Sequence, residues 1–117
     1  MDIRELVRAL MRGDLLTARQ FVADAQRSEF RWEMVTEPAD LNNVEMVIAA
    51  AVVELLAQRA ETPAPQWTHR VAGLGEPLIL DPGLDGMPRS FARAKIDGPE
   101  PLLKRNLVAL PDFLAVA

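Results

Sequence analysis

The side chains best suited to catalysis are few in this sequence. His69 is the only histidine and there is no cysteine, which excludes multi-histidine metal sites and thiolate chemistry. A catalytic histidine needs positioned partners, and the nearest hydroxyls in sequence, Thr62 and Thr68, belong to no nucleophile-elbow pattern. His69 is therefore predicted to be a surface or capping side chain beside Trp67.

Carboxylates gather around one predicted loop and its exit: Glu33, Glu37, Asp40 and Glu45. Paired acids can bind a divalent cation or act as acid and base, but this spacing matches no EF-hand loop. The glycine-containing stretches "GLGEP" and "DPGLDG" match neither the P-loop nor the dinucleotide fingerprint. The pattern favours a solvated acidic loop, and neither a metal nor a cofactor is predicted. A small hydrolase or metal enzyme that uses the acids from Glu33 to Asp40 is the weakest of the alternative hypotheses.

Arg4, Arg8 and Arg12 recur every four residues and therefore share one flank of the first predicted helix. This flank could meet DNA phosphates or an acidic partner, although interspersed acids make a solvated flank the commoner explanation. The formal net charge of −4 disfavours a general nucleic-acid binder. A helical DNA-binding regulator that uses these arginines remains the alternative hypothesis.

Proline and glycine divide the chain into two parts. Eight of the nine prolines and five of the six glycines follow residue 62, so residues 1–61 are predicted to be helical and residues 62–117 mostly irregular. Apolar periodicity predicts a first helix over about 3–12 and a second after Asp14. The short link at Gly13 folds these two helices into an αα-hairpin.

A third helix, predicted over 44–56, is apolar nearly all round and so must be covered on several sides. We therefore predict a single, mainly α domain over residues 1–117. In it the αα-hairpin packs on a central apolar helix, and the Pro-rich half wraps over both.

The segment 99–117, "PEPLLKRNLVALPDFLAVA", forms an apolar tail. Leaving its large side chains in water would forfeit roughly 1.5–3 kcal/mol of burial for each. The tail is therefore expected to dock, either on the chain's own core or on a partner's surface. If the tail docks on a partner, the basic pair Lys104 and Arg105 is expected at the rim of the interface. The candidate partner-binding residues are Lys104, Arg105, Leu107, Phe113 and Leu114.

Three stretches, "LMRGDLLTARQFVADA", "TPAPQWTHRV" and "EPLLKRNLVALPDFL", look like parts of small bacterial proteins encoded beside toxin–antitoxin genes. In those proteins a helical portion leads into a tail with the patterns PL-x-[KR]-RN and P-[DE]-[FY]-L. The resemblance covers most of the chain and includes no catalytic residue. It implies an antitoxin-like accessory protein that pairs with another protein, a toxin being one candidate. The chain departs from the antitoxin scheme by lacking a basic recognition helix.

The leading hypothesis is a non-catalytic protein-interaction module of a bacterial two-protein system, binding another protein or a second copy of itself. Truncation after Gly98 is then expected to abolish partner binding while the helices remain. A cytoplasmic location with no membrane contact is expected. No apolar signal core follows Met1, and the longest apolar run, 46–53, is shorter than the ~20 residues of a membrane span.

Overall fold

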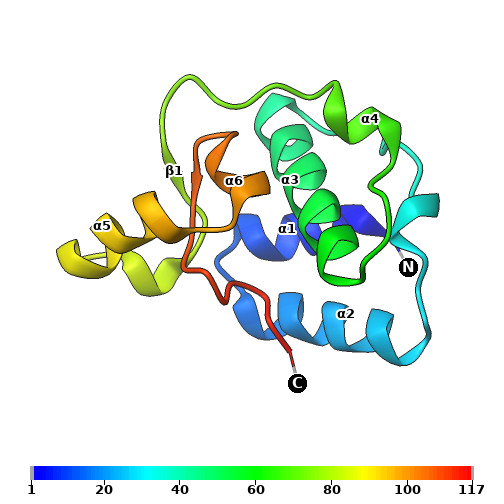
Figure 1. Ribbon diagram of the computed structural model, residues 1–117, viewed down its shortest axis with the longest axis horizontal. Coiled ribbons are helices and arrows are strands. Elements are labelled where there is room, and N and C mark those ends of the chain that lie inside the picture. The colour runs from blue at the N-terminus through cyan, green and yellow to red at the C-terminus, as the bar shows by residue number, and fades with distance from the viewer. Residues whose placement is uncertain (1, 117) are drawn as a thin grey trace.

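The computed structural model describes residues 2–116 and is mainly helical, as predicted (Figure 1). Two short strands and two 3-10 turns accompany the helices within this range. In chain order the elements are α1 (Ile3–Met11), α2 (Leu15–Arg27), η1 (Trp32–Met34), α3 (Asn43–Arg59), α4 (Gln66–His69), β1 (Leu78–Ile79), η2 (Pro82–Leu84), α5 (Pro88–Asp97), α6 (Glu100–Leu103) and β2 (Leu107–Val108).

Local capping sets the ends of α1 and α2. The Asp2 carboxylate accepts a hydrogen bond from the Arg4 backbone N–H (2.9 Å), and Asp14 accepts one from Thr17 (3.1 Å). Gly13 lies between the helices with a φ of 72°, a conformation that suits glycine. The chain reverses there, and α2 packs back against α1 (Figure 1).

Helix α3 runs through the middle of the molecule (Figure 1). A capping box starts it, because Glu45 N–H donates to the Asn42 side chain (2.8 Å) and Asn42 N–H donates to the Glu45 carboxylate (3.0 Å). Every residue from Val47 to Ala57 except Glu54 is buried. Helices α1, α4 and α6 and the turn η1 pack around α3, so an apolar helix is covered on several sides.

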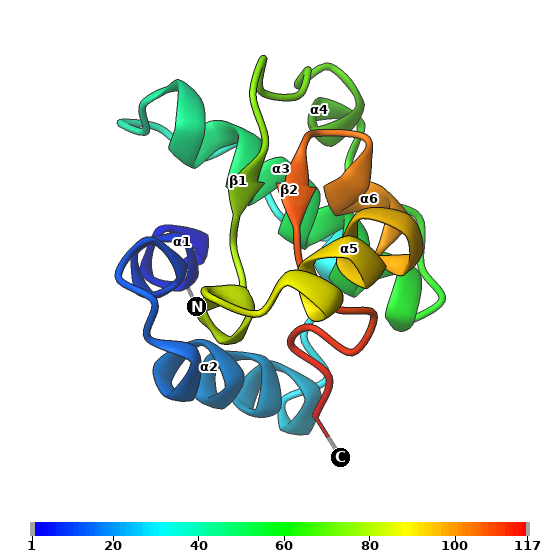
Figure 2. The same cartoon turned by 90° about the vertical axis from the view of Figure 1, so that its left-hand side faces the viewer.

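Within the second half of the chain, strands β1 and β2 form a parallel pair (Figure 2). Leu78 lies opposite Leu107 and Ile79 lies opposite Val108. The pairing brings the tail against the segment that precedes α5, across a long stretch of intervening chain. Upstream, Trp67 donates its indole N–H to the Val35 carbonyl (2.8 Å) and so fixes α4 to the loop after η1.

The tail completes the main core. Leu102 and Leu107 on α6 and β2, and Phe113 and Leu114 in the final turn, are at most 3% exposed within that core. A smaller apolar cluster joins η2, α5 and β2 through Leu84, Ala94 and Val108. Helix α5 belongs only to this smaller cluster, and Ala94 is its single fully buried residue.

Two glycines mark where backbone segments meet too closely for a side chain. A Cβ on Gly73 would lie 2.5 Å from the Arg105 Cα, and a Cβ on Gly98 would lie 2.5 Å from the Ala94 carbonyl oxygen and 2.7 Å from that of Ala109. All three contacts are with backbone atoms. These glycines let the tail lie directly against the chain that precedes it.

The Gly98→Ala substitution is therefore expected to lower the free energy of unfolding by about 1–3 kcal/mol, because α5 and the tail must separate to admit the methyl group. Urea denaturation followed by circular dichroism measures the change. Gly75→Ala is the matched control, since a Cβ at Gly75 meets nothing within 4 Å. Its stability should stay the same or rise by about 0.4–1 kcal/mol. Equal midpoints for the two variants would contradict the close contact at Gly98.

Candidate binding surfaces

The tail is attached to α3 by a buried guanidinium. Arg105 is only 2% exposed. It donates hydrogen bonds to the carbonyl oxygens of Thr68 (2.7 Å), Pro101 (2.9 Å) and Val71 (3.3 Å). Its Nη2 also lies 3.2 Å from Glu54 Oε1. The charge is therefore both hydrogen-bonded and paired, which a buried ion requires.

Glu54 is the acid of this network, with a side chain 12% exposed. Lys104 Nζ lies 2.6 Å from Glu54 Oε2, and His69 Nδ1 lies 3.5 Å from Oε1. Burial by itself raises the Glu54 pKa, but hydrogen bonds from Lys104 and Arg105 outweigh it and hold the pKa below its usual value. Glu54 is thus ionised at neutral pH and links α3 to two consecutive tail residues.

Asn106 extends the same attachment. It adopts a φ of 62°, in the left-handed region that asparagine tolerates better than most residues. Its side-chain amide donates to the Leu74 carbonyl oxygen (2.6 Å), while Leu74 N–H donates to the Arg105 carbonyl oxygen (3.0 Å). The "KRN" triplet therefore binds the chain's own helices and loops at each of its positions.

The structure brings all five predicted partner-binding residues to the chain's own interior or its edge. Lys104 and Arg105 pair with Glu54, and the apolar members Leu107, Phe113 and Leu114 are at most 3% exposed. Contact between these apolar side chains and a partner would require the tail to detach. Their role in binding a partner stays a prediction. In the sequence, the feature that indicates the network around Arg105 is Glu54, because a carboxylate within an apolar helix needs a cation.

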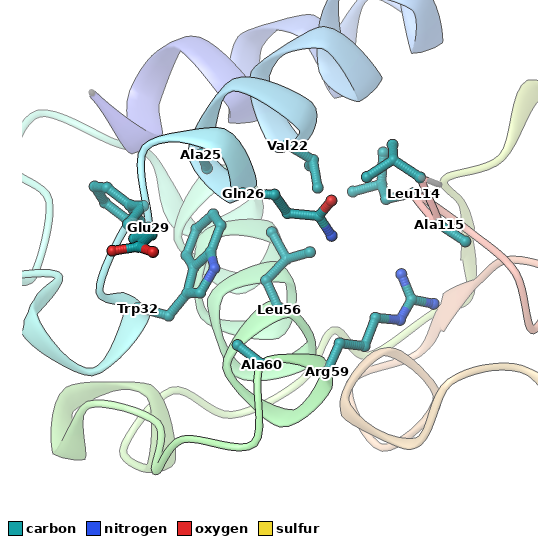
Figure 3. Close-up of a pocket in the computed structure, with 12 residues that line it drawn as sticks. Val22, Ala25, Gln26, Glu29, Trp32, Leu56, Arg59, Ala60, Leu114 and Ala115 are labelled. Atoms are coloured by element: carbon teal, nitrogen blue, oxygen red, sulfur yellow. The ribbon is translucent and has the colours of Figure 1, made fainter.

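An open cleft of about 400 Å³ lies between α2, the end of α3 and the tail (Figure 3). Its polar lining side chains are Gln26, Glu29 and Arg59. Its buried apolar lining consists of Val22, Ala25, Trp32, Leu56 and Leu114. The three segments that form it are far apart in the sequence.

Arg59 lies where this cleft meets the tail. Its guanidinium donates to the carbonyl oxygens of Phe113 and Pro111, the latter at 3.2 Å. Desolvation lowers the Arg59 pKa, and the more distant charge of Asp112 offsets only part of this effect. Among residues 2–116, no carboxylate lies within 4 Å of its nitrogens.

A second hollow, of about 300 Å³ and widely open, lies beside strand β1. Its lining includes Ile79, Leu84, Met87, Pro88 and Phe91. Ile79 is 41% and Met87 52% exposed. The ammonium of Lys95 lies 5.5 Å from the centre of the Phe91 ring, so a positive charge lies next to one of the side chains that line this hollow.

Strand β1 also has an outward-facing edge. Leu78 N–H donates to the Asn106 carbonyl (2.8 Å) and Leu80 N–H donates to that of Val108 (2.9 Å). Because alternate residues of a strand direct their backbone groups to opposite edges, Ile79 directs its N–H and C=O away from β2. The hollow and this edge form one surface, which we call the β1 edge surface.

The predicted DNA-contacting arginines Arg4, Arg8 and Arg12 all belong to α1 or its C-cap, and the side chains of Arg8 and Arg12 are exposed. Two of them have acidic neighbours: Arg4 lies 2.8 Å from Asp2 and 3.9 Å from Asp40, and Arg12 lies 3.7 Å from Asp14. These pairs reduce the positive charge that the flank presents to a phosphate backbone.

The acids predicted to form a solvated loop do not converge. Each has a separate neighbour: Glu33 lies 2.9 Å from Arg31, Glu37 3.9 Å from Arg70, Asp40 3.9 Å from Arg4, and Glu45 belongs to the α3 capping box. Within the described part of the chain, no group of three or more histidine, aspartate or glutamate side chains is arranged to hold a metal ion.

No protein-family model matches this chain, and no significant match was found among curated proteins or solved structures. No helix within residues 2–116 has the length and apolar character needed to cross a membrane. Function is therefore inferred from the surfaces of the molecule itself.

Proposed function

We propose that this protein is a non-catalytic interaction module that binds an extended segment of another protein along the β1 edge surface. The observation that supports the proposal is the combination, at one place, of an outward-facing strand edge and an exposed apolar hollow. The resemblance to proteins encoded beside toxin–antitoxin genes makes an antitoxin-like role, with a toxin as partner, the specific form of this hypothesis.

The recognition mode would be strand addition. The outward N–H and C=O of Ile79 offer backbone hydrogen bonds to an extended peptide. An apolar side chain of that peptide would then enter the hollow between Met87 and Phe91. Backbone hydrogen bonds would supply affinity, and the hollow would supply selectivity for the side chain.

The charge of the side chains near the hollow indicates which charge the partner segment carries. Helix α5 contains Arg89, Arg93 and Lys95 against the single acid Asp97. Lys95 lies beside Phe91, one of the residues that line the hollow. We therefore expect acidic residues next to the apolar residue of the partner, because complementary charge raises the association rate and excludes basic competitors.

This surface is available without any rearrangement of the chain. The apolar residues of the tail are buried in the core, whereas Ile79 and Met87 are exposed. Helix α5 buries only Ala94 completely, so one side of this helix is free to contact a partner. Binding sites that need no backbone movement are the common case among preorganised complexes.

Two substitutions should weaken the complex at least tenfold: Ile79→Pro, which removes the outward N–H, and Met87→Glu, which places an acid in the hollow. Proline is tolerated on the outer side of an edge strand because that N–H is outside the ladder. The complex is isolated from the native host, its partner is identified by native mass spectrometry, and the purified pair is then measured by calorimetry.

Leu16→Glu is the matched control, because Leu16 is an apolar residue 82% exposed on α2 that does not line the hollow. It should bind as the wild type does. A complex that survives both substitutions at the β1 edge surface contradicts the proposal. A homodimer lost in Ile79→Pro would instead identify a second copy of this chain as the occupant.

A further inference from the structure

The cleft between α2, α3 and the tail has the size and lining of a small-molecule site. At about 400 Å³ it falls within the range of roughly 300–1,000 Å³ that is typical of ligand pockets. Its buried lining is apolar, and only a few polar side chains face it (Figure 3). Such a combination binds a ligand's apolar body by burial and fixes its orientation through polar contacts.

Arg59 supplies the charge that selects the ligand. Two of its N–H groups donate to the Phe113 and Pro111 carbonyls, which leaves three of the five guanidinium donors for another acceptor. Carbonyl oxygens satisfy hydrogen bonds but carry no negative charge. A carboxylate would supply that charge, and the planar guanidinium fork matches a carboxylate's geometry.

The polar side chains are arranged along the cleft. Figure 3 shows Gln26 and Arg59 extending toward the tail at Leu114 and Ala115, while Glu29 lies toward the other end, near Trp32. The positive and amide groups therefore share one end. A ligand with one carboxylate is favoured over a dicarboxylate, because a second negative charge would approach Glu29.

The tail is shaped around this cleft. Leu114 has a φ of 60° although its side chain is bulky, and that side chain is 1% exposed. A bulky residue adopts this left-handed conformation only where the surrounding structure enforces it. Here the conformation turns the tail so that Leu114, Ala115 and Val116 line the cleft.

We propose that this cleft binds small monocarboxylic acids with an aromatic or branched apolar body, with the carboxylate on Arg59 and the body against Trp32 and Leu56. The ligand bridges α2, α3 and the tail. It therefore stabilises the docked tail, since any molecule that binds only the folded state raises the stability of that state. This site is separate from the β1 edge surface and does not depend on partner binding there.

The test uses the full chain and three probe acids: 3-phenylpropionate, indole-3-acetate and 4-methylpentanoate, each compared with its uncharged amide. Calorimetry should give a Kd at or below about 1 mM for at least one acid, and at least tenfold weaker binding for its amide. Methyl NMR shifts of Ala25, Leu56 and Leu114 should locate the bound acid.

Three variants make the test specific. Arg59→Gln should weaken acid binding at least tenfold and make acid and amide equal. Gln26→Glu, which alters an exposed α2 position without touching the tail's hydrogen bonds, should weaken binding of the acid but not of the amide. Arg19→Gln removes an exposed charge of α2 outside the cleft and should leave the binding of acid and amide unchanged.

The proposal is overturned if none of the three acids binds at about 10 mM, ten times the highest expected Kd. It is also overturned if acids and amides bind equally to the wild type, or if Arg59→Gln and Gln26→Glu leave acid binding unchanged. Loss of binding in Arg19→Gln would show attraction to surface charge rather than to the cleft.

Discussion

Replacing Arg105 with methionine is expected to lower the free energy of unfolding by about 3–5 kcal/mol, the usual cost of removing one partner from a buried ion pair. The substitution leaves Glu54 with only Lys104 and His69 nearby, and it removes the guanidinium that donates to the carbonyls of Val71, Pro101 and Thr68. Urea denaturation at pH 7 gives the change in stability.

Arg93→Met is the control for Arg105→Met. Arg93 is an arginine of the same half of the chain whose side chain is 65% exposed, 3.9 Å from Asp97. Exposed pairs of this kind are worth about 0–1 kcal/mol, so this variant should unfold close to the wild type. If Arg105→Met were equally stable, apolar contacts alone would hold the tail.

The pH dependence of this loss identifies its electrostatic origin. In the wild type the Glu54 pKa is lowered on folding, so its contribution to stability is present above about pH 4.5 and is lost as pH falls through the folded pKa. Without Arg105 the Glu54 pKa should be higher than in the wild type. The stability difference between the two proteins should therefore shrink as pH is lowered from 7 toward 4.

A chain that ends at Gly98 is expected to lose its cooperative fold. It lacks the tail residues that complete both apolar clusters: Leu102, Leu107, Val108, Phe113 and Leu114. Each contributes roughly 1.5–3 kcal/mol when fully buried, and together they are comparable with a whole domain's stability of roughly 5–15 kcal/mol. This differs from the sequence-based expectation that the helices would persist without the tail.

The truncated chain should give a shallow urea transition and a weakened near-ultraviolet spectrum. Adding a peptide of residues 99–117 should restore the spectrum, because α3 and β1 provide its docking site. A scrambled peptide of the same composition should not. A sharp, wild-type-like transition of the truncated chain alone would show that the N-terminal helices are sufficient.

The helices were predictable because their signals are local. Asp2, Asp14 and Asn42 accept hydrogen bonds from backbone N–H groups at the starts of α1, α2 and α3, and such residues cap helices through atoms only two or three positions away. The lengths followed from apolar periodicity in the same windows. In α5 the signals are also local, because Pro88 is the first helical residue and Gly98 follows the last.

The strand pair was not predictable from local pattern. Leu78 pairs with Leu107, which lies beyond a turn, two helices and four prolines. Two-residue strands show no period-2 alternation to measure. Only the assembled fold, in which α6 directs the chain back along β1, places them side by side.

The burial of Arg105 could not be predicted from the sequence, because it depends on contacts between distant segments. In sequence, a Lys-Arg pair after two leucines is typical of an interface rim. In the structure, Arg105 reaches carbonyl oxygens of both short helices, that of Thr68 in α4 and that of Pro101 in α6. A guanidinium has enough donors to satisfy them together with Glu54.

Ribosomes deliver α3 before the segments that cover it. While residues 99–116 are still being made, the apolar surface of α3 that α6 and the rest of the tail later bury is open to other molecules. The nascent chain then has an unfilled hydrophobic surface of the kind that chaperones bind and aggregation exploits. Folding of this protein should consequently wait for the emergence of the tail, and the delay between α3 and the tail would set how long the growing chain is exposed to aggregation.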